Sequence, residues 1–315
     1  MSRMPFNSQS ATVSAIIPTY NCAKTVTEAI KSILAQTVAV FEIFVIDDGS
    51  TDNTKEALVP FVGKVNYIYQ ENSGGPGRGR NEGIRRARGN IIAFLDADDV
   101  WHPWKLEFQL RVLADHPEIG ALGTQTFAWP SPIVPQMPKV VPNLVFCPLK
   151  ELLVRNIIAT SSVVVRRETL QRAGEFVEDR LFGSEDLDLW LRIADVSVIA
   201  LLPLPLMGYR DMVGSLSKRA LRMRGNGFEI VEKWVKNGYL KRRFFLRNKA
   251  LAHVYFASAL AQNSEGNWAG ACRDLLYSLF RYPFPYLRDK RFLFARLGRL
   301  VLYTYSHFFR KGQRS

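Results

Sequence analysis

The chain has 315 residues, of which 47% are hydrophobic and 23% are charged. This length suffices for one large α/β domain with an appendage, and the hydrophobic content excludes a disordered chain. The net charge of +13 is unevenly distributed, because residues 1–217 hold 21 Lys and Arg against 24 Asp and Glu, whereas residues 218–315 hold 21 against 5. A mildly acidic body therefore carries a basic C-terminal region, which can meet nucleic acid, an anionic membrane surface or an acidic polymer.

The three cysteines, Cys22, Cys147 and Cys272, are widely spaced and have no spacing that suits zinc or a redox pair. We interpret them as reduced thiols. The first dozen residues lack the apolar stretch of a signal peptide, and no apolar run is long enough to span a bilayer. We therefore expect a cytoplasmic protein without integral membrane segments.

Apolar β-rich runs alternate with amphipathic segments through the first hundred residues. The predicted strands cover residues 13–18, 41–46, 65–69 and 91–95, and the predicted helices cover residues 24–36, 51–61 and 81–88. This alternation over short loops predicts an α/β fold with a Rossmann-like, mainly parallel sheet and helices on both faces. Ligands bind beyond the carboxyl ends of such strands, so Tyr20, Asp48 and Asp98 should gather at one edge.

The second half of the chain is less regular. Trp129–Pro148 contains six prolines and can form neither a regular helix nor a central strand, so it is either a rigid surface connection or a substrate lid. A strand over 161–166 and a helix over 186–193 follow. From Lys218 onward the sequence is basic, aromatic and mostly helical, which predicts two domains, 1–217 and 218–315. Within the second, Phe292–Phe309 has the pattern of an interfacial amphipathic helix and equally that of a helix packed on the main domain.

Three carboxylates crowd the end of the apolar run 91–95, in Asp96-Ala97-Asp98-Asp99. Like charges at this spacing repel one another unless a cation or hydrogen-bond donors lie among them, so a hard metal that carries phosphate oxygens is a natural ligand. An acidic turn is the structural alternative. Two further acidic clusters, at 47–48 and 185–188, favour the metal.

Over residues 12–217 the chain resembles the family-2 glycosyltransferases. The motifs that carry the resemblance are Pro18-Thr19-Tyr20-Asn21, 45–52, Phe94-Leu95-Asp96-Ala97-Asp98-Asp99 and 185–192, with support from 72–75, 80–83, Tyr209-Arg210 and 215–217. Each motif alone is weak, but the four occur in the family's order. The resemblance implies a nucleotide-diphospho-sugar transferase fold of the A type with a metal-bound donor.

The resemblance also implies a donor site, which would comprise Pro18, Tyr20, Asp48, Arg80, Asp96, Arg210 and Ser215. Tyr20 would stack on the base and Asp48 would accept a ring N–H, although Asp48 alone also suits a turn before Gly49. Asp98 would bind Mg²⁺ or Mn²⁺ that bridges to the diphosphate. Asp96 would contact the ribose or order the metal shell, and we expect Asp99 to cap the helix that begins near Pro103.

The implied reaction is a displacement at the anomeric carbon by an acceptor hydroxyl. The family's position for the general base matches Asp186, and direct attack with one base inverts the anomeric configuration. Asp188 is the competing base, but on a helix it points about 200° away. No His follows Tyr209-Arg210 closely, so a His metal ligand is not expected there. The signature of processive synthases is absent after Asp186, which favours single additions to a glycan or lipid-linked acceptor in cell-surface polysaccharide or glycolipid synthesis.

Other classes of function remain as alternatives. A dinucleotide-dependent oxidoreductase would need a glycine-rich first turn, but this turn is Pro18-Thr19-Tyr20-Asn21-Cys22. In a non-catalytic nucleotide- or carbohydrate-binding module we would expect some of the acidic motif residues to be replaced, whereas Asp48, Asp96, Asp98 and Asp186 are all present. The basic tail alone suggests nucleic-acid binding. We expect instead that it attaches the protein peripherally to the anionic inner face of the cell membrane.

Overall fold

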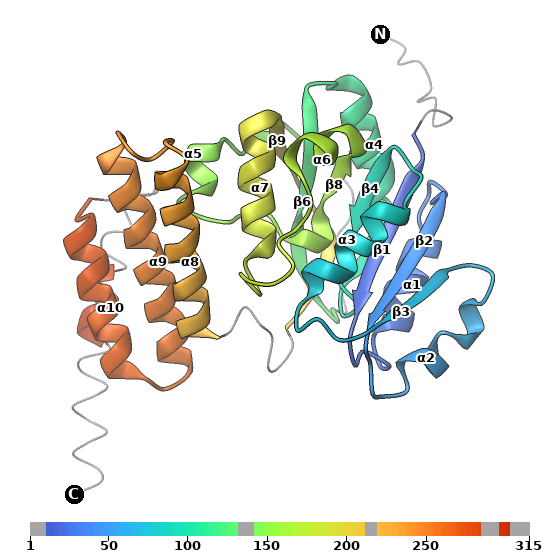
Figure 1. Cartoon of the computed structure of the whole chain (residues 1–315), viewed down its shortest axis with the longest axis horizontal. Coiled ribbons are helices and arrows are strands. Elements are labelled where there is room, and N and C mark those ends of the chain that lie inside the picture. Colours follow the sequence, from blue (N-terminus) through green and yellow to red (C-terminus); the bar gives the residue numbers. More distant parts are fainter. Residues whose placement is uncertain (1–10, 132–141, 212–218, 285–295, 303–315) are drawn as a thin grey trace, which may run out of the picture. The chain divides into compact units, whose positions relative to one another are not determined.

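The computed structural model describes residues 11–131, 142–211, 219–284 and 296–302. The chain divides into two compact units: residues 1–149 with 156–213, and residues 150–155 with 214–315. The first unit contains a β-sheet and the second is helical (Figure 1).

Nine strands form one sheet in the described part of the first unit, in the order β3-β2-β1-β4-β8-β6-β9-β5, and β7 pairs with β9. The strands are β1 Val13–Thr19, β2 Glu42–Asp48, β3 Asn66–Gln70, β4 Ile91–Phe94, β5 Val100–Trp101, β6 Ile119–Trp129, β7 Val145–Phe146, β8 Val164–Arg166 and β9 Val198–Arg210. The strands β3, β2, β1 and β4 are parallel, as predicted. The other half is mixed, because β8 runs antiparallel to both β4 and β6, while β6 and β9 are parallel. The predicted α/β class is therefore confirmed, with a mixed sheet.

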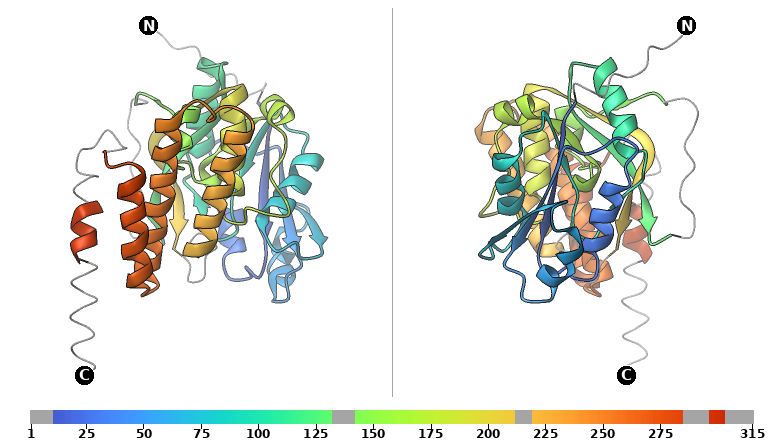
Figure 2. Two further views of the ribbon diagram at one scale, coloured as in Figure 1. Left: turned by 60° about the vertical axis from the view of Figure 1, so that its left-hand side comes forward. Right: turned by 90° about the vertical axis from the view of Figure 1, so that its right-hand side faces the viewer.

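Helices cover both faces of this sheet (Figure 2). They are α1 Val26–Leu34, α2 Thr54–Ala57, α3 Pro76–Arg86, α4 Lys105–Asp115, α6 Arg167–Ala173 and α7 Glu185–Val196, with short 3₁₀ turns at Val59–Phe61 and Thr160–Ser162. Helix α5, Leu149–Leu152, belongs to the second unit except for its first residue. Successive side chains of β1 point to opposite faces of the sheet. Val13, Ala15 and Ile17 therefore share one face, where they pack in a core with α1 and α4. On the opposite face, Gly83 of α3 packs on Ile16, where an added Cβ would lie 2.5 Å from Ile16 Cγ2.

The helix predicted over 81–88 begins five residues earlier, at Pro76. The glycines of this segment favour a loop by propensity, but Pro76 suits a first helical turn. Close packing then explains the glycines, because an added Cβ at Gly77 would meet the carbonyl oxygen of Val177 at 2.4 Å. Tertiary contacts therefore override local propensity here.

The proline-rich segment contributes one short strand, since Val145–Phe146 pairs with the edge of β9. Both side chains are exposed, as expected for an edge. Residues 132–141 lie outside the described residues. The two alternatives for this segment, a surface connection and a substrate lid, therefore both stay predictions.

The second unit contains α8 Ala220–Lys236, α9 Phe244–Ser264, α10 Trp268–Arg281 and a helical segment over 296–302. This confirms the predicted helical C-terminal region. Its apolar core surrounds a buried carboxylate, Asp274, which accepts from Arg224 at 2.9 Å, Ser258 at 2.6 Å and Gln262 at 2.6 Å. Most of the predicted Phe292–Phe309 helix lies outside the described residues. None of the described helices combines the length and hydrophobicity that crossing a bilayer requires.

Candidate active site

The candidate site lies where the parallel strands end. Strand β1 lies between β2 and β4, with Thr19 opposite Asp47 and Ile16 opposite Phe94. Tyr20, Asp48 and Asp96 follow or end these three strands, so the structure brings them to one edge of the sheet. Tyr20 is half exposed and Asp48 is buried. Pro18 is the penultimate residue of β1.

Asp48 fixes the loop that follows β3. Its carboxylate accepts hydrogen bonds from the Ser73 backbone N–H at 3.0 Å, the Ser73 hydroxyl at 2.9 Å and Gln70 Nε2 at 2.5 Å. Asn72 Nδ2 donates to the Asp48 carbonyl oxygen at 2.8 Å. These bonds occupy much of the carboxylate, so the contact between Asp48 and a base stays a prediction.

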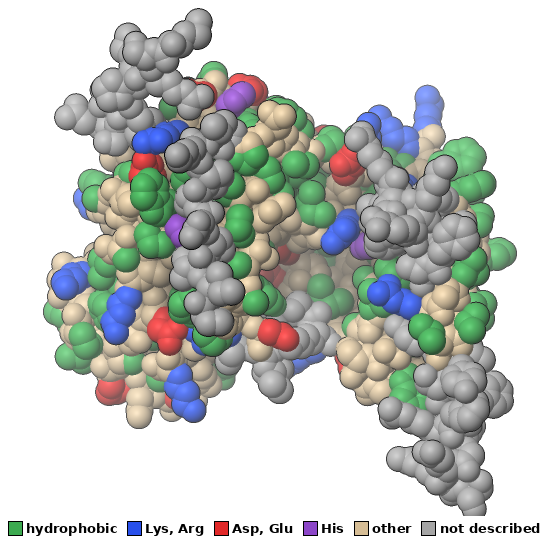
Figure 3. Space-filling model, turned by 180° about the vertical axis from the view of Figure 1, so that it is seen from behind, with side chains coloured by type: hydrophobic (Ala, Val, Ile, Leu, Met, Phe, Trp, Pro, Cys, Tyr) green, Lys and Arg blue, Asp and Glu red, His purple; other side chains and the backbone are tan. Residues whose placement is uncertain are grey.

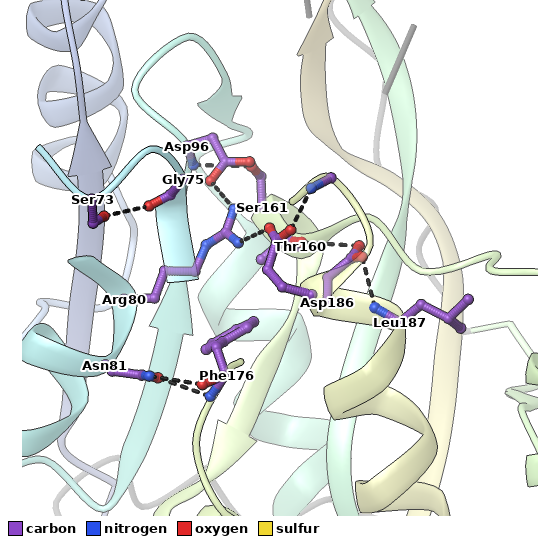
Figure 4. Close-up of polar contacts among 12 residues, drawn as sticks. Ser73, Gly75, Arg80, Asn81, Asp96, Thr160, Ser161, Phe176, Asp186 and Leu187 are labelled. Carbon is purple, nitrogen blue, oxygen red and sulfur yellow. Dashed lines mark hydrogen bonds and ion pairs between the residues drawn. The ribbon is translucent and has the colours of Figure 1, made fainter. Parts of the chain in front are cut away.

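Arg80 joins two acidic clusters that are far apart in the sequence. It lies on α3 and is 3% exposed, and its Nη2 donates to Asp96 Oδ1 at 2.7 Å while its Nη1 donates to Glu185 Oε1 at 2.7 Å (Figure 4). Its guanidinium also lies over the ring of Phe176, at 5.2 Å from the centroid. Asp96, which is partly exposed, and the buried Glu185 in the first turn of α7 are thus held together by one buried cation, because charge-assisted hydrogen bonds are strong.

Glu185 was not among the site residues that the sequence predicted. Its second oxygen, Oε2, accepts from the Gly183 N–H at 2.6 Å, so this carboxylate orders the entry to α7 as well as binding Arg80. The sequence contains a weak signal for it, because Glu185 directly precedes Asp186 in an acidic first turn, where carboxylates are favoured.

Asp98 and Asp99 lie beside Arg210. The Arg210 side chain donates through Nε to the Asp98 carbonyl oxygen at 2.9 Å, and its backbone N–H donates to Asp99 Oδ1 at 3.1 Å. Burial and the nearby carboxylate of Asp96 raise the pKa of Asp98 to about 6 and that of Asp99 to about 8. Arg210 Nη2 also binds Glu28, at 2.6 Å.

The expected helix cap at Asp99 is wrong. The helix begins at Lys105, after Trp104. Strand β5 pairs with β9 between Asp99 and that helix, and this pairing holds Asp99 against Arg210. A two-residue strand of this kind carries no clear sequence signal.

Asp186 lies in the first turn of α7 and is surrounded by hydrogen-bond donors. Its Oδ2 accepts from Asn156 Nδ2 at 3.1 Å and from the Thr160 hydroxyl at 3.3 Å, and its Oδ1 accepts from the Leu187 N–H at 2.6 Å (Figure 4). Burial and then the charge of Glu185 raise the pKa of Asp186 to about 7, against the lowering effect of Arg80 and the hydrogen bonds. A carboxylate with this pKa can accept a proton near neutral pH.

Asp188 has a structural environment instead. It is fully buried, and its Oδ2 accepts from Arg192 Nε, one helical turn later, at 2.9 Å. Arg192 in turn donates to the carbonyl oxygen of Glu175 at 2.7 Å. Asp188 therefore anchors α7 to the segment after α6.

The 3₁₀ turn Thr160–Ser162 contacts both Asp96 and Asp186. The Ser161 hydroxyl accepts from the Asp96 N–H at 3.0 Å, while Thr160 donates to Asp186 (Figure 4). Neither residue was among the predicted site residues, because a strand predicted over 161–166 does not indicate the 3₁₀ turn over Thr160–Ser162 that presents their hydroxyls.

No group of three or more His, Cys, Asp and Glu side chains that could hold a metal occurs in the described ranges. Asp98 and Asp96 could thus supply only part of a metal shell, and a donor diphosphate and water would supply the rest. The predicted donor-site residue Ser215 lies outside the described residues.

Solved structures share the architecture of this chain. TarS 1–349 of S. aureus has a TM-score of 0.57 with 22% identity, over 86% of this chain and 81% of that chain. The mannosyltransferase PcManGT from Pyrobaculum calidifontis, solved with GDP-Man and Mn²⁺, has a TM-score of 0.59 with 19% identity, over 92% of this chain and 87% of that chain. The fold is therefore that of the A-type nucleotide-diphospho-sugar transferases.

Residues 14–129, which are less than half of the chain, match the model of glycosyl transferase family 2. This segment is therefore similar to that family.

Curated relatives align with this chain over a limited length. The UDP-Glc:alpha-D-GlcNAc-diphosphoundecaprenol beta-1,3-glucosyltransferase WfgD of Escherichia coli is 39% identical over 102 residues, which are 32% of this chain and 40% of that protein. The putative teichuronic acid biosynthesis glycosyltransferase TuaG of Bacillus subtilis is 35% identical over 106 residues, 33% of this chain and 42% of that protein. An uncharacterized glycosyltransferase of Nostoc sp. is 40% identical over 114 residues, 35% of both proteins. The chain thus spans less than half the length of each of these relatives.

Proposed function

We propose that the protein transfers a sugar from a nucleotide-diphosphate donor to an acceptor hydroxyl, with inversion, in the synthesis of a cell-surface polysaccharide or glycolipid. The observation that carries this proposal is the Arg80 bridge, which holds Asp96 and Glu185 on one cation. Through it, the aspartates beyond β4, which would bind the donor, would share one site with Asp186, which would contact the acceptor.

In this proposal Asp186 is the general base. An acceptor hydroxyl is a weak nucleophile until its proton is removed, and a carboxylate with a pKa of about 7 can remove it near neutral pH. Asn156 and Thr160 would orient the carboxylate, because both donate to the same oxygen while the Leu187 N–H donates to the other. Tyr20 would stack on the donor base, and Arg210 would help to orient the turn at Asp98.

The pH dependence of transfer should follow from this role. Since the base works only when it is deprotonated, the rate should fall as the pH is lowered through about 7, the pKa of Asp186. The measurement is the initial rate at saturating donor between pH 5 and 9. A rate that is flat through this range down to pH 5 would exclude Asp186 as the titrating base.

A divalent metal, Mg²⁺ or Mn²⁺, would bind at Asp98 with support from Asp96. The donor set fits such an ion, because two nearby carboxylates repel each other and burial raises the pKa of Asp98 to about 6, so a cation there would relieve both penalties. When bound, the metal would neutralise the leaving diphosphate. Asp98 and Asp96 would hold the ion. Arg210 would stay against the turn that contains these aspartates, because its Nε donates to the Asp98 carbonyl oxygen.

Asp98→Ala should therefore weaken nucleotide-sugar binding at least tenfold in the presence of Mn²⁺, because it removes the proposed metal ligand. Calorimetric titration with and without a chelator measures this. Asp115→Ala, at the end of α4, is a matched control that removes an exposed carboxylate of the same unit. Equal affinity of wild type and Asp98→Ala, with or without chelator, would contradict the metal assignment.

We propose a lipid-linked or glycan acceptor and a peripheral position at the anionic inner face of the cell membrane. Support comes from the acceptor named for WfgD, which is diphosphoundecaprenol-linked, and from the excess of basic residues over 218–315. A nucleic acid is the less favoured partner, since nothing in the candidate site requires one.

The experiment that tests the function is a panel of nucleotide sugars with the purified protein, Mg²⁺ or Mn²⁺, and a readout of released nucleoside diphosphate. We expect metal-dependent hydrolysis of at least one donor. Binding of a nucleotide sugar without turnover, with or without acceptors, would favour a non-catalytic binding module instead.

A further inference from the structure

The turn after α8 and the first two residues of α9 present five exposed residues in a row, Lys241-Arg242-Arg243-Phe244-Phe245, here called the basic aromatic turn. The Phe244 side chain is 70% exposed and that of Phe245 is 72% exposed. Single exposed apolar residues are ordinary, but adjacent exposed rings among cations are typical of an interaction surface.

The turn is firmly built beneath these side chains. Leu240 is buried, and its backbone N–H donates to the Trp234 carbonyl oxygen at 2.8 Å. The Tyr239 ring packs edge-on against Trp234 at 5.7 Å, and Arg243 stacks over Tyr239 at 3.9 Å and donates to its carbonyl oxygen at 3.1 Å. The exposed rings and cations are therefore held on a fixed base.

The positive charges of this turn are not neutralised by carboxylates of the described residues, although Arg243 stacks on Tyr239 and donates to its carbonyl oxygen. They immediately precede α9, where the helix dipole disfavours positive charge. In the part of the chain that the structure describes, none of the three is ion-paired with a carboxylate, in contrast to Lys236, which pairs with Glu232 at 3.0 Å. A negatively charged partner outside the chain would compensate for both penalties.

A second apolar group lies at the same end of the unit. Helices α9 and α10 are antiparallel, because Ser258 binds Asp274 and Ser278 donates to the Ala252 carbonyl oxygen. The end of α10 therefore lies near the start of α9, and there Phe280 is 84% exposed and is followed by an exposed arginine (Figure 1). Basic and hydrophobic side chains also lie side by side on the face of the helical unit seen in Figure 3.

We propose that the basic aromatic turn docks the protein on an anionic lipid bilayer, with Phe244 and Phe245 inserted at the interface and the three cations among the headgroups. This arrangement matches the way in which amphipathic segments bind such surfaces. A single-stranded nucleic acid would need a groove along which several bases stack, whereas these rings lie at the end of a helix pair. The inference rests on the proposed membrane location of the acceptor and names the segment that reaches it.

Co-sedimentation of the full chain with phosphatidylglycerol vesicles, and with phosphatidylcholine vesicles, tests the proposal. At low salt we expect binding to the anionic vesicles only. The substitutions K241Q/R242Q/R243Q should lower the partition coefficient about 100-fold, and F244S/F245S should lower it at least about tenfold. Matched controls in the first unit, K31Q/K55Q/K64Q and V59S/V62S, remove the same number of exposed charges or apolar side chains and should change it less than about threefold.

Three results would overturn the proposal: no binding of the wild type to anionic vesicles at low salt, equal losses in the variants and their controls, or loss in the basic variant alone. The last result would indicate electrostatic adsorption to the bilayer without insertion of the two rings, since charge alone would suffice. Turnover of a nucleotide sugar without vesicles tests the proposed function separately. This turnover should be unchanged in F244S/F245S. Failure of the membrane proposal would therefore not imply failure of the proposed function, or the reverse.

Discussion

Asp186→Asn should lower sugar transfer by roughly 10²–10⁴-fold while donor binding persists, because the substitution keeps the shape of the side chain but removes its proton affinity. The amide can still meet Asn156 or Thr160 through one end, so the first turn of α7 should keep its conformation. The measurements are kcat with saturating donor and acceptor, and the Kd of the donor by calorimetry. The pH dependence near 7 should also disappear from the residual activity.

The control for this substitution is Asp195→Asn, an exposed carboxylate on the same helix. Asp188→Asn is a poorer control. Asp188 is buried and paired with Arg192, so its substitution should lower the stability of the protein. If Asp186→Asn retains normal transfer and Asp188→Asn loses it in folded protein, the base is Asp188 and the proposed site is wrong.

Arg80→Ala should destabilise the protein by about 3–5 kcal/mol, because it leaves Glu185 as a buried, uncompensated charge and removes the bridge to Asp96. Urea unfolding measures this loss. Arg86→Ala is a matched control on the same helix: Arg86 is about half exposed and pairs with Glu82 one turn earlier, so its loss should cost less than about 0.5 kcal/mol.

Arg80→Lys separates charge from geometry. A lysine keeps the positive charge but presents a single ammonium in place of a planar fork, so it cannot reach both carboxylates in the same way. We expect partial recovery of stability and poor recovery of transfer. Stability of Arg80→Ala within 1 kcal/mol of the wild type would contradict the bridge as the element that joins the two sides of the site.

The parallel half of the fold was predictable because its signals are local. Each of the first strands is a short apolar run followed by a polar residue, and the βαβ order then requires Tyr20, Asp48 and Asp98 to reach one edge. The structure confirms that arrangement of strands. The mixed half was predicted only in part: β8 lies within the strand expected over 161–166, whereas the two-residue β5 is defined by its pairing with β9.

The contacts within the site were harder to predict than its location. The Arg80 and Glu185 side chains are 105 residues apart in sequence, and no periodicity reports a contact over that separation. Arg80 was expected to meet the donor, and the structure places its guanidinium nitrogens on two carboxylates. Likewise, helical patterning predicts α9 but does not show that Phe244 and Phe245 face outward, because its apolar residues are not confined to one side.

The most direct test of the account is proton NMR of a transfer reaction with the donor that the nucleotide-sugar panel identifies. We predict that the donor is consumed and that the new glycosidic bond has the anomeric configuration opposite to that of the donor, as direct displacement assisted by a single base requires. A product that retains the donor's configuration would contradict the mechanism assigned to Asp186.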